Sequence, residues 1–245
     1  MSQLQPVYTH DDFWMVYKPA GMSVQESHHG PGVLAELKAR YEGEFLPVHR
    51  LDAGTSGLLL VARNAAANST LSQMFQARAV EKFYLALSNQ KPNKKQGTIS
   101  GDMQKSRRGA WKLLHTHENP SATQFFSKGL GGMRLFLVKP LTGKTHQIRV
   151  ALKSIGAPIL GDESYAGKEA DRMYLHAYAL RFRYQDQLME FCALPPPENA
   201  FAALHDAEVQ AWLMRPWDKA WPDAPAQIRR PGAAADKWQP EEAEE

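Results

Sequence analysis

The sequence predicts an α+β fold: one domain over residues 1–215, with a long mixed and mostly antiparallel sheet flanked by helices. Segments with the pattern of strands outnumber those with the pattern of helices and follow one another directly, which favours antiparallel neighbours. The chain has 245 residues, of which 43% are apolar and 22% are charged. This composition is typical of globular proteins, and the length is enough for a substantial core.

Strands are expected where short apolar or alternating runs lie between turn residues. Residues 58–62 form a wholly apolar run between Gly57 and Arg63, which predicts a strand buried on both faces. The other strands are expected over residues 13–17, 82–87, 98–99, 111–115, 123–127, 134–139, 174–184 and 188–192.

Helices are expected where apolar residues recur at helical spacing. Leu71, Met74 and Phe75 share one face of a predicted helix over residues 65–79. Ile148 and Ile155, with a leucine between them, predict a helix over residues 146–155. Two further helices are expected over residues 32–41 and 201–213.

Residues 216–245 differ in composition from the rest of the chain. They contain five prolines, seven acidic and four basic residues, and they end in Glu-Glu-Ala-Glu-Glu. We therefore expect a mobile, proline-rich acidic tail. The remainder carries 25 basic and 19 acidic residues, so the predicted domain is basic.

Several classes of protein are disfavoured. No stretch resembles a membrane span or a signal peptide, so we expect a cytoplasmic protein without membrane association. The single Cys192 excludes a disulfide framework, and we read His28–His29 and the pair His115 and His117 as loop residues rather than metal ligands. Gly143-Lys144-Thr145 is not an NTPase phosphate loop, because the required first glycine is replaced by Val138.

Two loop-like stretches are strongly basic: KPNKKQG over residues 91–97 and KSRRGAWK over residues 105–112. They could form a solvated hairpin. They could instead contact phosphates, because neutralisation of the backbone supplies most of the sequence-independent affinity for nucleic acid. The sequence leaves both possibilities open.

The stretch HRLDAGTSGLLLVARN, residues 49–64, carries the strongest functional signal. His49, Arg50 and Asp52 stand directly before the predicted buried strand, where a rigid element can hold a reactive side chain. Four other stretches also carry polar groups next to predicted strands and helices: KPAGMSV, EKFYLAL, LTGKTHQIRV and GAPILGDESYAG followed by LHA.

In this order and spacing, the five stretches closely resemble the RluA-type pseudouridine synthases over roughly residues 7–195. The resemblance implies a stand-alone catalytic domain with an RNA groove across its sheet. It also implies isomerisation of uridine in RNA to pseudouridine, with no metal and no organic cofactor. The implied partner is a structured RNA, either tRNA or ribosomal RNA, and we expect a monomer.

The resemblance also implies individual roles. Asp52 matches the essential aspartate that begins the reaction at the target uridine, and Arg50 matches the residue that enters the RNA stack where the base is flipped out. Tyr84 matches the tyrosine that packs on the uracil and is proposed to handle the sugar proton. Arg149 matches the arginine that pairs with the aspartate.

The other residues that we expect to bind substrate are His49, Thr55, Lys82, Lys144, His146 and Gln147. The sequence departs from the family at Lys144, where arginine is usual, and at Ala151, where many members have histidine. No basic RNA-binding module precedes residue 7.

Physical chemistry supports a pairing between Arg149 and Asp52. An enclosed carboxylate stays ionised more readily beside a guanidinium, and Arg149 could form a fork to both of its oxygens. Two alternatives remain. One is a catalytically silent RNA-binding module. The other is a hydrolase that uses Asp162 or Glu163 as a second carboxylate, although their Gly-rich turn favours a structural role.

Overall fold

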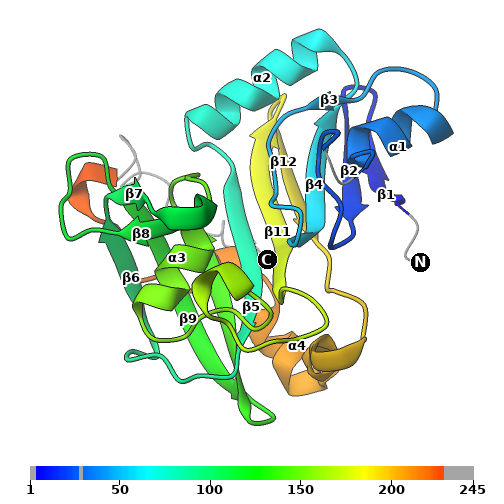
Figure 1. Cartoon of the computed structure of the whole chain (residues 1–245). Coiled ribbons are helices and arrows are strands. Elements are labelled where there is room, and N and C mark those ends of the chain that lie inside the picture. The colour runs from blue at the N-terminus through cyan, green and yellow to red at the C-terminus, as the bar shows by residue number, and fades with distance from the viewer. Residues whose placement is uncertain (1–3, 28–29, 229–245) are drawn as a thin grey trace, which may run out of the picture.

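A single long sheet forms the centre of the molecule (Figure 1). The computed structural model describes residues 4–27 and 30–228, so the pair His28–His29 lies outside the described residues. The strand order is β1 (Pro6–Thr9), β2 (Phe13–Lys18), β4 (Ser56–Ala62), β11 (Leu175–Tyr184), β5 (Glu81–Ser88), β10 (Met133–Pro140), β9 (Ser121–Leu130) and β6 (Gln96–Gly101). Two shorter pairings complete it, because β12 (Gln187–Cys192) pairs with β11 and β3 (Leu46–Pro47) pairs with β4.

The sheet is mixed and mostly antiparallel, as the sequence predicts. Strands β4 and β11 pair in parallel, whereas the other described pairs are antiparallel. All seven residues of β4 are buried, in agreement with a strand covered on both faces. A separate small hairpin consists of β7 (Met103–Lys105) and β8 (Trp111–Leu113), and it lies next to α3 (Figure 1).

Within the described residues, four α-helices lie around the sheet: α1 (Val33–Arg40), α2 (Ala65–Gln76), α3 (Gln147–Ser154) and α4 (Ala207–Leu213). Asn64 caps α2 by accepting a hydrogen bond from the backbone N–H of Ala67 (2.8 Å), as N-cap asparagines commonly do. Helix α2 ends at Gln76 instead of extending to residue 79, because Arg78 has a positive φ of 59°. Such a residue cannot continue a right-handed helix.

The predicted helix over residues 201–213 is wrong as a single element. A 3-10 helix covers Asn199–His205, and α4 begins after Asp206, whose backbone is extended. The Asp206 carboxylate accepts hydrogen bonds from the backbone N–H groups of Glu208 and Val209. This local bonding competes with a continuous helix and starts a new one.

Residues 216–228 also differ from expectation, because they pack on the sheet instead of beginning a mobile tail. Trp221 lies 5.7 Å from Phe83 and 4.9 Å from Phe126, measured between ring centroids. The hydroxyl of Thr98 donates to the carbonyl oxygen of Asp223 (2.8 Å). Aromatic burial outweighs the effect of the prolines here. Residues 229–245 of the predicted tail lie outside the described residues.

Candidate active site

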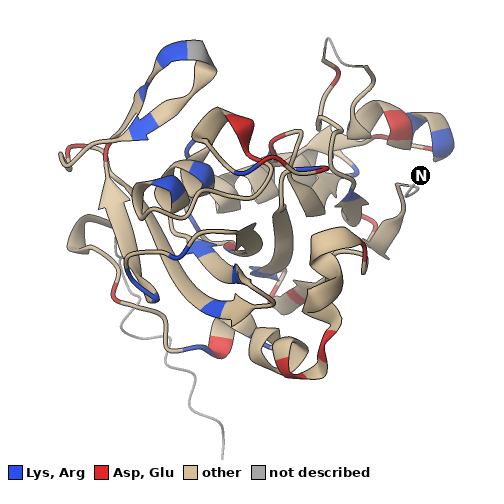
Figure 2. Ribbon diagram, turned by 60° about the horizontal axis from the view of Figure 1, so that its bottom comes forward, with Lys and Arg blue, Asp and Glu red and all other residues tan. Residues whose placement is uncertain are grey.

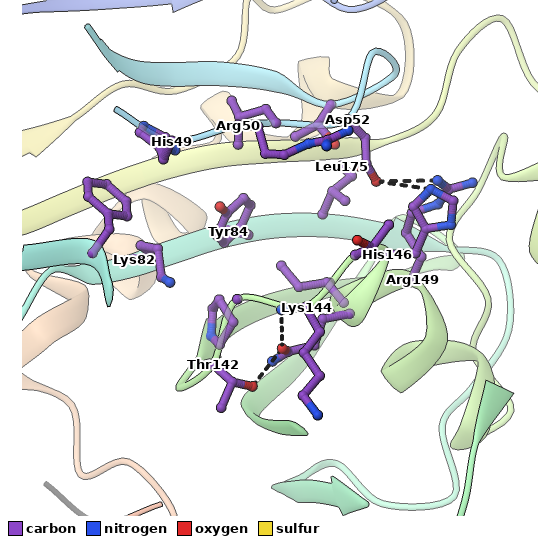
Figure 3. Close-up of a pocket in the computed structure, with 18 of the residues that line it drawn as sticks. His49, Arg50, Asp52, Lys82, Tyr84, Thr142, Lys144, His146, Arg149 and Leu175 are labelled. Carbon is purple, nitrogen blue, oxygen red and sulfur yellow. Dashed lines mark hydrogen bonds and ion pairs between the residues drawn. The ribbon is translucent and has the colours of Figure 1, made fainter. Parts of the chain in front are cut away.

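A cavity of about 500 Å³ opens between the segment before β4, strand β5 and the turn before α3 (Figure 3). Its walls combine one carboxylate, Asp52, with five arginine and lysine side chains. The basic residues are Arg50, Arg78, Lys82, Lys144 and Arg149. A site of this size can enclose one nucleoside-sized group, and its charge favours an anionic ligand.

Asp52 lies in a tight turn that is fastened to the end of β2. The backbone N–H of Thr55 donates to the carbonyl oxygen of Asp52 (3.0 Å). The buried ammonium of Lys18 donates to the carbonyl oxygens of Met22 (2.6 Å) and Ala53 (3.0 Å). Burial is the main reason that the pKa of Lys18 falls to about 7. In sequence, Lys18 reads as part of an ordinary turn, and its contact with Ala53 joins residues 35 positions apart.

Arg149 joins Asp52 to a second carboxylate. Its Nε and Nη2 atoms donate to the two oxygens of Asp162 at 2.7 and 2.8 Å, and its Nη1 donates to Oδ2 of Asp52 at 3.3 Å. The expected fork between Arg149 and both oxygens of Asp52 is therefore wrong. Asp162 takes the fork because its side chain is only 1% exposed, against 24% for Asp52, and a buried carboxylate needs full compensation.

The charge of Arg149 is well supported in this position. Burial opposes it, but the hydrogen bonds to Asp162 and the negative charges of Asp162 and Asp52 raise the pKa of Arg149 above its ordinary value. Asp162, weighed from the sequence as a turn residue, thus holds the guanidinium of Arg149 next to Asp52. In the sequence, only its place in a Gly-rich stretch set Asp162 apart, and that pattern did not indicate that it pairs with Arg149.

Tyr84 lies on the wall of the cavity, on β5, as Figure 3 shows. Burial, and then the charge of Asp52, raise the pKa of its hydroxyl, so the phenol stays neutral. Lys82, two residues earlier on the same face of the strand, lines the same cavity, as the period of a strand requires. Tyr84 therefore offers an aromatic face within the cavity that Asp52 lines.

Two of the expected substrate-binding residues, His49 and Gln147, form hydrogen bonds with other residues of the protein. Nε2 of His49 accepts a hydrogen bond from the backbone N–H of Leu60 (3.0 Å), and its ring stacks on Phe75 at 4.4 Å. The Gln147 amide donates to the carbonyl oxygen of Ala122 and the hydroxyl of Thr123, and it accepts from Thr142 and from the backbone of Lys144. Both residues shape the cavity wall, and the Gln147 amide has no N–H left for a ligand.

The remaining expected residues also reach the cavity. Arg50 is exposed at its rim, whereas Thr55 is buried in its wall. The Lys144 ammonium donates to the carbonyl oxygen of Asn119, which ties the turn before α3 to a neighbouring loop. His146 lies 3.9 Å from Asp52, measured from Nε2 to Oδ2.

A second cavity, of about 660 Å³, is also lined by Asp52. Asp52, Arg50, His146 and Arg149 border both cavities. Within the described residues, no group of three or more His, Cys, Asp or Glu side chains could hold a metal ion. In the same part of the chain, no helix is long and apolar enough to span a bilayer.

Comparison with known proteins identifies the family of the chain. Residues 12–154 match the family described as RNA pseudouridylate synthase. The chain is 48% identical over 198 residues to an uncharacterized RNA pseudouridine synthase of Haemophilus influenzae, covering 79% of this chain and 88% of that one. It is 36% identical over 183 residues to the ribosomal large subunit pseudouridine synthase C of Rickettsia felis, covering 70% of this chain and 60% of that one.

A solved structure of a related protein supports the same family. The fold matches human RNA pseudouridylate synthase domain containing 1 with a TM-score of 0.72 and 30% sequence identity, over 91% of this chain and 97% of that one. The α+β fold is therefore confirmed. The chain belongs to the RluA-type RNA pseudouridine synthases, the enzymes that isomerise uridine in RNA to pseudouridine.

Proposed function

We propose that the enzyme flips a specific uridine of a structured RNA into the cavity beside Tyr84 and that Asp52 is the carboxylate that begins the reaction. The observation that carries this proposal is the single carboxylate in an otherwise basic cavity, held by Arg149 at 3.3 Å. Isomerisation breaks the bond between N1 and C1′, forms a bond between C5 and C1′, releases the hydrogen of C5 as a proton, and leaves N1 to take up a proton. An anionic group beside the sugar suits the first of these changes.

The contacts of Asp52 favour one of its oxygens for this task. Arg149 and His146 both face Oδ2. We expect Oδ1, the other oxygen, to face the substrate. The neutral ring of Tyr84 suits stacking on the uracil, which offsets part of the cost of unstacking the base from the RNA.

The RNA itself is expected to lie over the basic surface around the cavity. Arg50 stands exposed at the rim of both cavities, where an inserted side chain would meet the strand on either side of the flipped base. Lys105 and Arg107 are exposed on the hairpin of β7 and β8, and Figure 2 shows basic residues on this projecting element. Such residues suit contact with phosphates.

Hydrolysis is the less favoured chemistry for this site. A glycosidase of the usual kind needs two separately acting carboxylates. The Asp162 carboxylate is committed to Arg149 through both oxygens, and Glu163 is exposed and lines only the second cavity. A silent binding module is disfavoured because Asp52, Tyr84 and Arg149 are all present in one site.

The decisive variant is Asp52→Asn, which is nearly isosteric and removes only the charge. RNA labelled with tritium at C5 of uridine releases the label to water only if the new bond to C1′ forms. We expect the variant to melt near the wild type and to bind RNA, but to release no detectable tritium. Release near the wild-type rate would remove Asp52 from the mechanism. Free uracil as the product would indicate hydrolysis.

The RNA target is proposed as tRNA or ribosomal RNA. Relatives named for the ribosomal large subunit are 36% identical to the chain, but the chain covers only 60% of their length. Pseudouridine maps of cells with and without the gene would identify the modified position. A uridine that loses modification only in the deleted strain is the expected result.

A further inference from the structure

Tyr165 and His146 connect the basic hairpin to the reacting carboxylate. Tyr165 lies in the 3-10 helix Glu163–Tyr165 and is 1% exposed. Its hydroxyl accepts a hydrogen bond from the backbone N–H of Trp111, in β8, at 2.9 Å. The same hydroxyl lies 2.9 Å from Nδ1 of His146, and Nε2 of His146 faces Oδ2 of Asp52 at 3.9 Å.

These contacts decide where the proton of His146 lies. A tyrosine hydroxyl has one hydrogen to donate. The bond from Trp111 uses an oxygen lone pair and leaves that hydrogen for Nδ1 of His146. A neutral imidazole that accepts at Nδ1 carries its own hydrogen at Nε2, and this hydrogen then points toward the Asp52 carboxylate. The opposite tautomer would place a lone pair against the carboxylate, which is unfavourable.

The surroundings of His146 keep it neutral in this arrangement. Burial, and then the charge of Arg149, lower the pKa of His146, with Arg50 acting in the same direction. Asp52 and Asp162 act in the opposite direction. The Tyr165 ring also meets His146 edge-on at 5.7 Å and lies 4.9 Å from the Arg149 guanidinium, so Tyr165 contacts both residues that face Oδ2.

The backbone conformation of His146 is an uncommon one, which is consistent with a side chain that is held in one position. Its φ is 57° and its ψ is 18°, in the left-handed region, and it is the N-cap residue of α3. Histidine is one of the few residues enriched there, and strain of this kind is found where a side chain must be held in one place.

We propose that Tyr165 and His146 are positioning residues for the isomerisation, with Tyr165 fixing the His146 tautomer so that Nε2–H holds Oδ2 of Asp52. The distance of 3.9 Å is longer than a hydrogen bond, and such contacts commonly shorten when substrate closes the site. The proposal rests on Asp52 as the reacting carboxylate. It predicts that Tyr165 acts on the rate only through His146.

A double-mutant cycle tests this dependence. Tyr165→Phe removes the hydroxyl but keeps the ring against Arg149, and His146→Asn removes the imidazole but tolerates the left-handed backbone. The rate is measured as single-turnover tritium release with enzyme in excess over RNA. We expect Tyr165→Phe to slow release roughly fivefold and His146→Asn roughly tenfold, within the range for residues in one hydrogen-bond network.

The double variant should be no slower than His146→Asn alone. The RNA dissociation constant should stay within about twofold of the wild type, because the hairpin keeps its own strand pairing. Independent, multiplying effects would overturn the proposal, as would an unchanged rate in Tyr165→Phe. Tritium release by Asp52→Asn tests the underlying mechanism separately, because the cycle compares only enzymes that retain Asp52.

Tyr174→Phe is the matched control. The Tyr174 hydroxyl also accepts from a backbone N–H, that of Ala200 (3.3 Å), and donates to a side chain, that of Asp171 (2.6 Å). Tyr174 is equally buried and lines neither cavity. This variant should lose stability like Tyr165→Phe and keep the wild-type rate, so an equal loss of rate in both would indicate a merely structural effect and overturn the proposal.

Discussion

Arg149→Lys keeps a positive charge at residue 149 and removes the planar guanidinium fork. The guanidinium makes two hydrogen bonds to Asp162, at 2.7 and 2.8 Å, and one to Asp52, at 3.3 Å. A lysine ammonium is a single point at the end of a flexible chain and cannot span both carboxylates. We therefore expect it to pair with Asp162, whose side chain is only 1% exposed, and to leave Asp52.

The size of the effect follows from the hydrogen bonds that lysine cannot make. A hydrogen bond to a charged group contributes about 1.5–3 kcal/mol. Removal of one of the two bonds to Asp162 should reduce the free energy of unfolding by roughly that amount. Asp52 loses the Arg149 donor at Oδ2, and a comparable weakening at the reacting group would slow turnover by roughly tenfold to a hundredfold.

Urea denaturation gives the free energy of unfolding, and tritium release at saturating RNA gives the turnover rate. Arg181→Lys provides the control, since Arg181 pairs with Glu190 at 3.1 Å on a partly exposed part of the sheet. That variant should lose less than about 1 kcal/mol and no activity. If Arg149→Lys unfolds and turns over like the wild type, the fork does not position Asp52.

Two further predictions concern RNA binding and acid stability. Replacing Lys105 and Arg107 by Ala should weaken RNA binding and reduce the slope of log affinity against log salt by about 0.7–0.9 for each phosphate that the protein no longer neutralises; an unchanged slope would exclude this surface. Burial lowers the pKa of His176 to about 3 in the folded protein, against about 6.5 in the unfolded chain. Between these two pH values only the unfolded chain binds the proton. Each pH unit of acidification in this range therefore lowers the free energy of unfolding by about 1.4 kcal/mol. Unfolding of the wild type and His176→Gln from pH 7 to pH 5 should show a smaller loss in the variant, and parallel losses would contradict the assignment.

The features that could be predicted best from the sequence are those that a local pattern of residues determines. The wholly apolar run before Arg63 became β4, with every residue buried, because such a run has no solvent-facing side. The placement of Asp52, directly before this strand, follows from the same pattern. Lys82 and Tyr84 share a face because the period of a strand is two residues.

Apart from the pairing of Arg149 with Asp52, the contacts between residues far apart in the sequence could not be predicted. Two carboxylates, Asp52 and Asp162, compete for Arg149, and only their different burial decides which receives the fork. Tyr165 reads as a turn residue until the fold brings Trp111, 54 positions away, to its hydroxyl. The segment after residue 215 has the composition of a tail, yet Trp217 and Trp221 pack against Phe83.

Asp52 and Tyr84 lie close together because of a row of three paired residues, one each from β4, β11 and β5. Gly57 in β4 pairs with Ala177 in β11, and Ala177 pairs with Tyr84 in β5. Gly57 has a φ of 111°, and a Cβ atom there would lie 2.2 Å from the carbonyl oxygen of Ala177. Only glycine therefore allows β4 to lie this close to β11. Neighbouring strands are about 4.8 Å apart, so the backbones of Gly57 and Tyr84 lie about 10 Å apart. Any side chain at residue 57 would push β4, and with it the turn that carries Asp52, away from the ring of Tyr84. The Thr-Ser-Gly sequence before the apolar run is thus part of what sets the width of the site.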